Sequence, residues 1–239
     1  MTSETAFAQS FASTWRLLAP ATDLFVRKIN TMYREREFAP LRSVVAPERR
    51  GLINEAGFEL FRIRRVAWFR NFGEAKREVM AEAVESAKAT IGRIERMDPN
   101  DVVVPSDVEE AEIALLAERL QLFFSRVAER ESLEVQPKFP GCGIIDTCFG
   151  DVRFGDALYE VKAGDRNFRS VDVRQLMIYA ALCKSARMQP LRRMGLFNPR
   201  TGFSFCISLD EVCLEVSGTG SEELLAEIIR VISSGDTSR

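Results

Sequence analysis

The spacing of apolar residues divides the chain into a helical first part and a second part that mixes strands with helices. Apolar residues recur at three- and four-residue spacing over residues 15–34 and 54–70, and residues 74–97 are rich in strong helix formers. Residues 97–107 contain two prolines among polar residues, which is typical of a linker. We therefore predict a mostly helical accessory region over residues 1–98 and a second domain over residues 99–239.

The second part has a regular order of elements. Ser106 or Asp107 is placed to cap a helix over residues 108–127. Alternation predicts strands at residues 133–139, 151–154, 157–163, 194–197 and 203–209, and glycines at residues 141–148 indicate a turn or bulge. Further helices are expected at residues 171–186 and 222–232. The order α-β-β-β-α-β-β-α predicts an α/β sandwich around a small mixed sheet.

The segment DVRFGDALYEVKAG, residues 151–164, has the pattern of a hairpin. If Gly155 and Asp156 form a type II′ loop, Asp151 lies opposite Glu160, with Cβ atoms about 4.5–5.5 Å apart. One face then carries only residues that can be buried: Val152, Phe154, Ala157, Tyr159 and Val161. The other face carries Asp151, Arg153, Leu158, Glu160 and Lys162. This register brings two carboxylates together, with a lysine two residues further on.

Opposed carboxylates destabilise a sheet unless a cation lies between them. Mg²⁺ prefers oxygen ligands and commonly takes one or two carboxylates while keeping several waters. Such an ion polarises a phosphoryl oxygen, and Lys162 would orient or deprotonate the attacking water. The alternative is a solvated strand face with incidental charges.

Composition removes several kinds of chemistry. The chain has no histidine, which excludes Ser-His-Asp and Cys-His catalysis and every metal site that needs imidazole. The apolar fraction of 46% and the charged fraction of 28% are ordinary for a globular protein, and no apolar run approaches the roughly 20 residues that span a bilayer. The N-terminus lacks the pattern of a secretory signal, and the five cysteines form no CxxC pair. We expect a cytoplasmic, reduced protein with no membrane contact.

The string GDVRFGDALYEVKAG, the helix expected before it and the later RQLMIYA resemble the PD-(D/E)XK nuclease superfamily, in its RecB-like branch. Gly150-Asp151 stands where Pro-Asp is usual, Glu160-Val161-Lys162 matches E-x-K, and residues 175–179 match Q-x-x-x-Y. The resemblance covers about residues 108–210. It implies a restriction-endonuclease-like α-β-β-β-α-β core and a Mg²⁺-dependent endodeoxyribonuclease, with Mn²⁺ as a substitute, acting on DNA in bacterial defence or restriction.

The resemblance also implies roles for individual residues. Asp151 and Glu160 would bind the metal together with the main-chain carbonyl of Val161, and Lys162 would be the catalytic lysine. Gln175 and Tyr179, four residues apart on one helical face, would contact the metal-bound water or the DNA backbone.

Some family members add a glutamate from the first helix. Glu112 is our choice because it shares a stripe with Leu116 and Leu120, and the competing residues are Glu109, Glu110 and Glu118.

A second aspartate competes with Asp151 for the metal. Asp146 lies fourteen residues before Glu160, a spacing also found among RecB-like nucleases. In an uninterrupted hairpin it would lie roughly 17 Å from Asp151 along the strand and on the other face. A bulge at Gly150 or a wider loop would restore it. We favour Asp151.

Local charge points to nucleic acid. Residues 161–200 hold nine lysines and arginines but two acids, and we expect Arg166, Arg169 and Arg174 to contact phosphates. Residues 31–70 hold nine arginines against five glutamates, which suits nucleic acid or a partner protein.

Since no G-x-x-x-x-G-K-[ST] loop occurs, an ATP-driven step would need a partner ATPase. Three hypotheses stay open: a nuclease that acts alone or as a homodimer, a nuclease subunit that needs such a partner, and a non-catalytic nucleic-acid-binding module.

Overall fold

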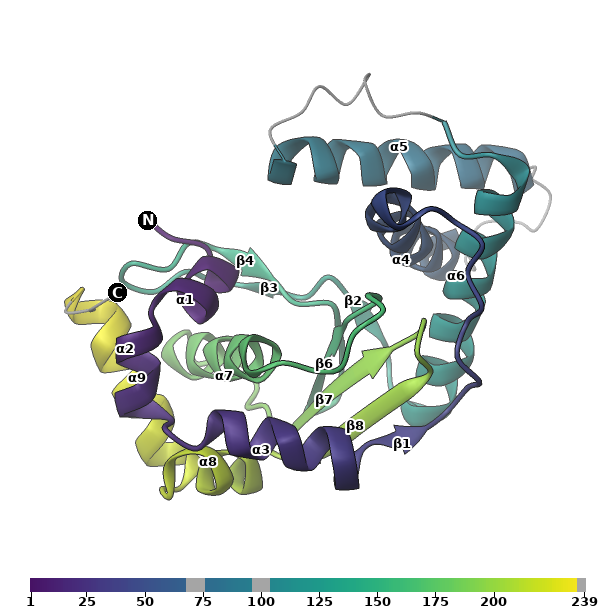
Figure 1. The fold of residues 1–239 in the computed structure, drawn as a ribbon. Coiled ribbons are helices and arrows are strands. Elements are labelled where there is room, and N and C mark those ends of the chain that lie inside the picture. The colour runs from purple at the N-terminus through teal and green to yellow at the C-terminus, as the bar shows by residue number, and fades with distance from the viewer. Residues whose placement is uncertain (68–75, 96–103, 236–239) are drawn as a thin grey trace.

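The protein is an α/β protein with a helical N-terminal region and a six-strand mixed sheet (Figure 1). The computed structural model describes residues 1–67, 76–95 and 104–235. The strand order is β1-β8-β7-β6-β5-β2, with β6 and β7 parallel and all other neighbours antiparallel. The strands are β1 (Glu35–Arg36), β2 (Glu134–Val135), β5 (Val152–Phe154), β6 (Ala157–Val161), β7 (Arg193–Asn198) and β8 (Phe203–Ser208). A separate pair is formed by β3 (Lys138–Phe139) and β4 (Cys148–Phe149).

Helices cover both faces of the sheet. One side holds α1 (Glu4–Ser10), α2 (Ala12–Leu18), α3 (Thr22–Lys28), α7 (Ser170–Ser185), α8 (Leu209–Ser217) and α9 (Ser221–Ser234). The other side holds α6 (Asp107–Val127) and α4 (Arg50–Ala67), and α5 (Lys76–Glu95) packs on α4 farther from the sheet. A hydrophobic core lies on each side of the sheet, and the strands contribute to both because their side chains alternate between the two faces. Leu158 and Leu196 pack with the first group of helices, whereas Tyr159 and Phe197 pack with the second. The sheet is thus the middle of three layers.

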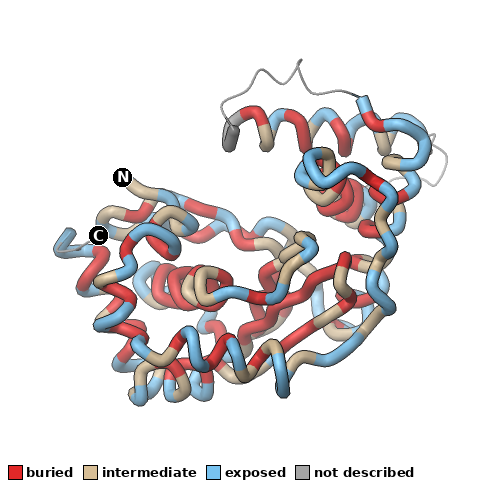
Figure 2. The backbone as a smooth tube through the Cα atoms, in the orientation of Figure 1, coloured by how far each residue is buried: buried red, intermediate tan, exposed pale blue. Residues whose placement is uncertain are grey.

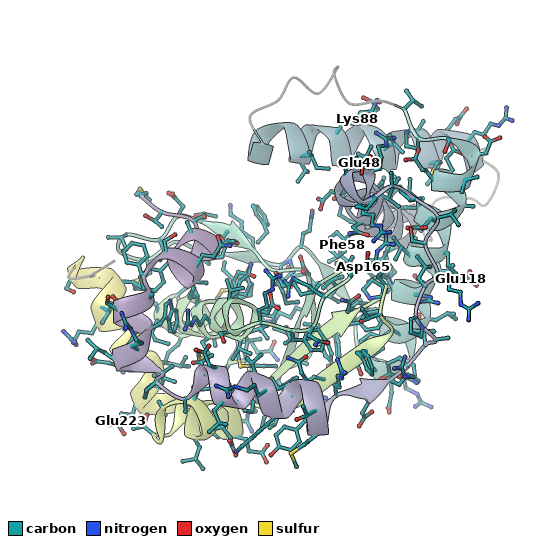
Figure 3. All side chains as sticks on the ribbon, viewed as in Figure 1. Glu48, Phe58, Lys88, Glu118, Asp165 and Glu223 are labelled. Carbon is teal, nitrogen blue, oxygen red and sulfur yellow. The ribbon has the colours of Figure 1, made fainter. Side chains whose placement is uncertain are left out.

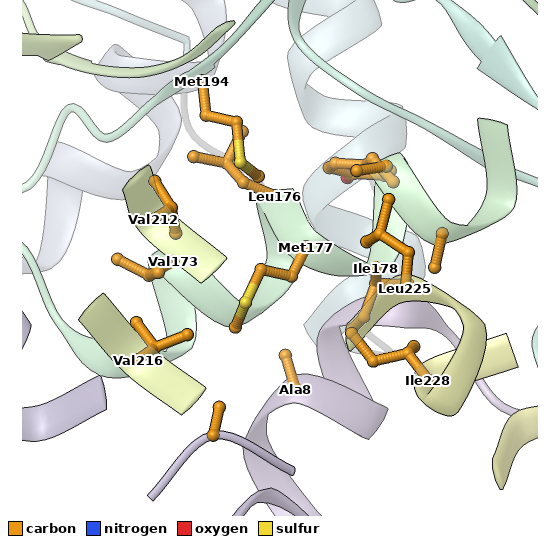
Figure 4. Close-up of a cluster of buried hydrophobic side chains, with 14 of the residues drawn as sticks. Ala8, Val173, Leu176, Met177, Ile178, Met194, Val212, Val216, Leu225 and Ile228 are labelled. Atoms are coloured by element: carbon orange, nitrogen blue, oxygen red, sulfur yellow. The ribbon is translucent and has the colours of Figure 1, made fainter. Parts of the chain in front are cut away.

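Helix α7 is the centre of the first core. It is apolar nearly all round, which is typical of a helix enclosed on every side. Figure 2 shows it buried along most of its length, and Figure 4 shows Leu176 and Met177 among side chains from α8, α9, α1 and β7. Its position is therefore fixed from several directions, which matters because it carries Gln175 and Tyr179.

Helix α6 anchors the second core. Both the backbone N–H and the hydroxyl of Ser106 donate to Glu109, so the predicted cap is present. At its C-terminal end Phe123 stacks on Phe197 of β7, with ring centroids 4.0 Å apart, and meets Tyr159 of β6 edge-on at 5.7 Å. These contacts hold α6 against the centre of the sheet.

Several predicted elements are confirmed, with ends within a few residues. They are the helix at residues 108–127, the hairpin of β5 and β6, the helices at residues 171–186 and 222–232, and the β7–β8 hairpin around residues 198–202. The single strand at residues 133–139 is wrong: Gln136 has φ 57°, a left-handed conformation that ends β2 before β3 begins. The helical spacing predicted over residues 15–34 corresponds to two helices, because Pro20 separates α2 from α3.

The N-terminal helices share a core with the rest of the chain. Phe7, Trp15 and Phe25 belong to the same buried cluster as α7, and β1 closes the sheet by pairing with β8. Helix α1 and strand β1 were not predicted. The division at residues 98–99 stays a prediction, and most of the proposed linker lies outside the described residues. Among the described helices none is long and apolar enough to cross a membrane.

The packing of α2 yields a test of this shared core. Trp15 is 0% exposed and its indole N–H donates to the carbonyl of Phe7 at 3.1 Å. We expect Trp15→Ala to lower the free energy of unfolding by about 3–5 kcal/mol, measured by urea denaturation. Leu17→Ala is the control from the same helix, since Leu17 is 83% exposed and its loss is expected to change stability by less than about 0.5 kcal/mol. Equal effects of the two substitutions would contradict the shared core.

Candidate active site

The β5–β6 hairpin places the candidate residues. Val152 pairs with Tyr159 and Phe154 with Ala157, the predicted register. Gly155 opens the two-residue loop with φ 51°, a conformation that favours glycine. Glu160 and Lys162 therefore point to the face covered by α7, and Asp151 comes directly before β5.

Asp151 is held beside the end of β6. Its carboxylate accepts a hydrogen bond of 2.6 Å from the backbone N–H of Val161, and its carbonyl accepts one of 2.8 Å from the N–H of Gln136. The pairing of β5 with β6 ends at Val152 and Tyr159. The bond from the Val161 N–H to the Asp151 side chain takes the place of the next hydrogen bond between the two backbones. The carboxylate is thereby fixed next to that of Glu160, and the two influence each other's pKa.

The competing aspartate lies elsewhere. Asp146 belongs to the loop before β4, and its N–H donates to the carbonyl of Thr2 at 3.0 Å. The charge of Asp151, by contrast, contributes to the raised pKa of Glu160. The geometry thus brings Asp151, rather than Asp146, to the E-x-K strand.

Glu160 is the most constrained group of the site. It is 4% exposed; Oε1 accepts from the Lys162 ammonium at 2.8 Å, and Oε2 is buried with no hydrogen-bond partner among the described residues. Burial, together with the charge of Asp151, raises the pKa of Glu160 to about 8. Burial also raises the pKa of Asp151 to about 6. The two carboxyls therefore resist being ionised together, despite the nearby lysine.

Lys162 is a fixed cation in this arrangement. Its ammonium donates to Glu160 and, at 2.9 Å, to the amide oxygen of Gln175, and it lies 3.9 Å from Asp172. Burial lowers the pKa of Lys162, but the carboxylates of Glu160, Asp151 and Asp172 outweigh it, so the pKa lies above its ordinary value. The side chain is suited to bind and stabilise negative charge more than to accept a proton.

Gln175 and Tyr179 extend the same chain of hydrogen bonds. The Gln175 amide nitrogen donates to the Tyr179 hydroxyl at 3.0 Å and to the hydroxyl of Thr5 on α1 at 3.2 Å. The Tyr179 hydroxyl donates to the carbonyl of Phe149 at 3.0 Å. Tyr179 is 1% exposed, which leaves little surface for the nucleic-acid contact expected of it. Its position suits it to orient Gln175, and through Gln175 the ammonium of Lys162.

The donor set fits a divalent cation that prefers oxygen. Asp151 and Glu160 bring two carboxylates close enough to influence each other's pKa, and Oε2 of Glu160 has no hydrogen-bond partner among the described residues. No group of three or more histidine, cysteine, aspartate or glutamate side chains poised for a metal is found among the described residues. Two protein carboxylates leave most positions to water or substrate, which is the arrangement that Mg²⁺ commonly takes.

Helix α4 lines one side of the candidate site, which the sequence did not predict. A cavity of about 190 Å³ lies against Asp151 and Val161 and is lined from α4 by Gly51, Asn54, Glu55 and Phe58. The charge of Glu55 contributes to the raised pKa of Asp151. The four α4 residues follow i, i+3, i+4, i+7 spacing, so one helical face was visible in the sequence. Its mixed polar and apolar character, however, gave no indication of what it would face.

Glu112 lies apart from the candidate carboxylates. It accepts from Arg200 at 2.6 Å and from Ser43 at 2.8 Å, forming a buried ion pair. Of its competitors, Glu109 pairs with Arg49, whose hydrogen bond lowers the pKa of Glu109 to about 2. Glu112 and Glu109 are therefore engaged by arginines, and no hydrogen bond joins either of them to Asp151 or Glu160 in the described part of the chain.

The three arginines expected at phosphates have different surroundings. Arg166 donates both guanidinium ends to Asp172, at 2.7 and 2.8 Å. Arg174 lies over the Trp15 ring, 5.7 Å from its centroid. Arg169 is exposed at the start of α7. Arg169 is thus the most accessible of the three to a ligand. A phosphate contact by any of the three arginines stays a prediction.

Comparison with models of known protein families finds no match to this chain, and comparison with curated proteins finds none either.

The raised pKa of Glu160 gives a pH dependence in metal-free buffer. The folded protein keeps the Glu160 proton between the ordinary pKa of 4.5 and about 8, whereas the unfolded chain loses it near 4.5. The free energy of unfolding should therefore fall as the pH rises through this window. In Glu160→Gln the fall should be smaller, as measured by urea denaturation in EDTA at several pH values.

The control for this test is Glu134→Gln, which removes an exposed carboxylate from β2. It should leave the wild-type slope unchanged. An equal slope in wild type and Glu160→Gln would show that Glu160 does not titrate in this range.

Proposed function

We propose that this protein is a Mg²⁺-dependent nuclease that hydrolyses phosphodiester bonds in DNA. The observation that carries the proposal is the state of Glu160: one oxygen is paired with the Lys162 ammonium, and the other is buried beside Asp151 with no hydrogen-bond partner among the residues that the structure describes. The ionised form of a buried Glu160 with an unused oxygen is costly unless a cation completes it.

The order of elements supports membership of the PD-(D/E)XK superfamily, in its RecB-like branch. Antiparallel β5 and β6 carry Asp151 and the E-x-K residues, α7 carries Gln175 and Tyr179, and β7 returns parallel to β6. With α6 before the strands, this succession is compatible with the restriction-endonuclease-like core that the motif implies. We therefore propose that fold for residues 107–198.

Asp151 and Glu160 would hold the metal, with the main-chain carbonyl of Val161 as a further oxygen. A bound Mg²⁺ ion supplies Lewis-acid polarisation of a phosphoryl oxygen and lowers the pKa of a bound water. The Val161 N–H keeps one Asp151 oxygen oriented, at 2.6 Å, so its other oxygen is the one available to a cation.

Lys162 would stabilise the charge that develops on the attacked phosphate. Its ammonium is held between Glu160 and Gln175 and is kept charged by the surrounding carboxylates. Gln175 orients the lysine and is itself oriented by Tyr179. A cation fixed in advance in a site with little water stabilises developing negative charge without reorganisation.

The two other hypotheses differ in what they require. A non-catalytic module has no need for two carboxyls that resist joint ionisation, so the pair argues for the enzyme. A partner ATPase, a homodimer and a role in bacterial defence stay proposals from the sequence. Cleavage by the purified protein alone, without ATP, would separate the independent nuclease from the partner-dependent subunit.

The two aspartates provide a matched pair of variants. Mg²⁺ or Mn²⁺ should raise the melting temperature of the wild type and support cleavage that EDTA abolishes. Asp151→Asn should lose both the thermal shift and the cleavage, whereas Asp146→Asn, with the same chemical change outside the site, should keep both. The reverse pattern would transfer the metal to Asp146, and robust cleavage in EDTA would overturn the proposed function.

Lys162→Met keeps the length of the side chain but removes its charge. We expect cleavage to fall by about 100-fold or more, since one fixed group that stabilises the transition state is lost. Lys138→Met, an exposed lysine of β3, is the control and should cleave like the wild type. Wild-type rates for Lys162→Met, measured under single-turnover conditions, would remove the lysine from the mechanism.

A further inference from the structure

The N-terminal region brings two arginines to one edge of the sheet. Strand β1 lies at that edge beside β8, and Arg36 lies directly opposite Phe203 in their pairing (Figure 1). The guanidinium carbon of Arg34 lies 3.8 Å from the centroid of the Phe203 ring, and that of Arg36 lies 4.2 Å from it. Two cations are therefore held against a single aromatic ring.

No carboxylate neutralises this pair. Neither Arg34 nor Arg36 forms an ion pair within the described parts of the chain, whereas Arg50, Arg126 and Arg166 each do. Burial, and then the charge of Arg36, lower the pKa of Arg34. The two guanidinium groups therefore repel each other with nothing from the described chain to offset the repulsion.

The acids closest in the sequence to the pair and to the loop before α7 are directed elsewhere. Glu35, between the two arginines on an extended segment, points to the opposite face. Glu37, Asp165 and Asp172 pair with arginines of α6, of α4 and of the loop before α7, respectively. Figure 3 labels Asp165 near α4, on which its partner lies. The positive charge at the sheet edge is thus available to a ligand.

Side-chain hydrogen bonds fix this edge before any ligand arrives. Arg34 directly follows a π-helical turn, Ile29–Tyr33, and such turns are frequent at functional sites. Arg34 donates to the amide oxygen of Asn167 at 2.7 Å. Asn30, within the turn, donates to the carbonyl of Phe168 at 2.9 Å and accepts from its N–H at 3.1 Å. A cation oriented in this way loses little freedom when it binds.

The loop that holds Arg34 also reaches the candidate active site. Arg166, directly before Asn167, donates to Asp172, and Asp172 lies 3.9 Å from the ammonium of Lys162. Arg169 is exposed two residues after Asn167, with the buried Phe168 between them. Cationic side chains thus continue from the candidate active site along this loop to the edge of the sheet.

We propose that Arg34 and Arg36 form a site for phosphate groups of the nucleic-acid backbone, outside the point of cleavage. This inference rests on the proposed function. An anion bound to both guanidinium groups removes their repulsion, and each group can donate two hydrogen bonds to phosphate in a fixed geometry. Because every nucleotide carries a phosphate, such a site adds affinity without reading the base sequence.

An acidic segment of a partner protein would offer carboxylates to the same two groups. Nucleic acid is favoured because the loop before α7 joins this pair to Lys162, through Arg166 and Asp172. One continuous phosphate chain can therefore meet the catalytic lysine and the sheet edge together.

The test measures DNA binding and its dependence on salt. Full-length protein in Ca²⁺ is titrated into two fluorescein-labelled DNA duplexes of unrelated sequence at several NaCl concentrations, and binding is followed by anisotropy. We expect Arg34→Gln and Arg36→Gln each to weaken binding to both duplexes by about three- to tenfold. Each should also reduce the slope of log K against log [NaCl] by about one. Arg36→Lys, which keeps the charge, should keep the wild-type slope.

Arg230→Gln is the matched control, since Arg230 is an exposed arginine of α9 that pairs with Glu227, and it should bind like the wild type. Every variant is checked by its melting temperature, and if Arg34→Gln does not fold, the exposed Arg36 decides. Unchanged affinity and slope in the folded variants, or an equal loss in Arg230→Gln, overturns the site. Labelled oligoglutamate that binds through these arginines while DNA does not would assign the pair to an acidic protein and also overturn it.

Cleavage in Mg²⁺ separates this site from the proposed function. DNA binding that depends on Arg34 and Arg36 without any cleavage supports the site and counts against the nuclease. Cleavage together with binding that is independent of the two arginines overturns the site while the proposed function stands. Absence of both binding and cleavage overturns both.

Discussion

The arrangement of the candidate site depends on the burial of Glu160 at the end of β6. In water two neighbouring carboxylates repel weakly, but beneath α7 and beside Asp151 the ionised pair loses much of its hydration. The Lys162 ammonium offsets part of this cost through one oxygen of Glu160, and Gln175 and Tyr179 hold the ammonium in place. If Glu160 were exposed to solvent, Lys162, Gln175 and Tyr179 would have no buried charge to orient them.

The three layers of the fold serve this burial. Because β6 alternates, the same five residues that place Glu160 toward α7 place Tyr159 toward α6, where Phe123 and Phe124 pack against it. Gly195, the parallel neighbour of Tyr159 on β7, leaves room for the ring: a Cβ there would lie 2.2 Å from Cε1 of Tyr159. The position of the carboxylate is thus determined by apolar packing on the opposite face of the sheet.

Much of the hairpin could be predicted from the sequence, because its information is local. Gly155-Asp156 sets the register, and alternation then assigns each residue a face. The contribution of α4 could not be predicted in this way. Glu55 and Asn54 reach the site because residues nearly a hundred positions apart pack together, and a single sequence carries no periodic signal for that.

Helix α8 was missed for another reason: Ser208 with Glu211 forms a capping box directly at the end of β8, and the strand pattern obscured the helix start. Arg200 was counted only among the basic residues, and its burial between Glu112 and Asn54 depends on tertiary contacts alone.

The pairing of β1 with β8 has a consequence for how the chain folds during synthesis. Glu35 lies opposite Ser204, so β1 is synthesised long before the strand that it pairs with. Helices α1 to α3 likewise cover a core whose centre, α7, is translated much later. Until then Trp15 and Phe25 lack their burial partners, and such exposed apolar surface favours aggregation or chaperone binding. The native sheet therefore cannot close before β8 has been synthesised, and pairing between strands so distant in the sequence slows folding further.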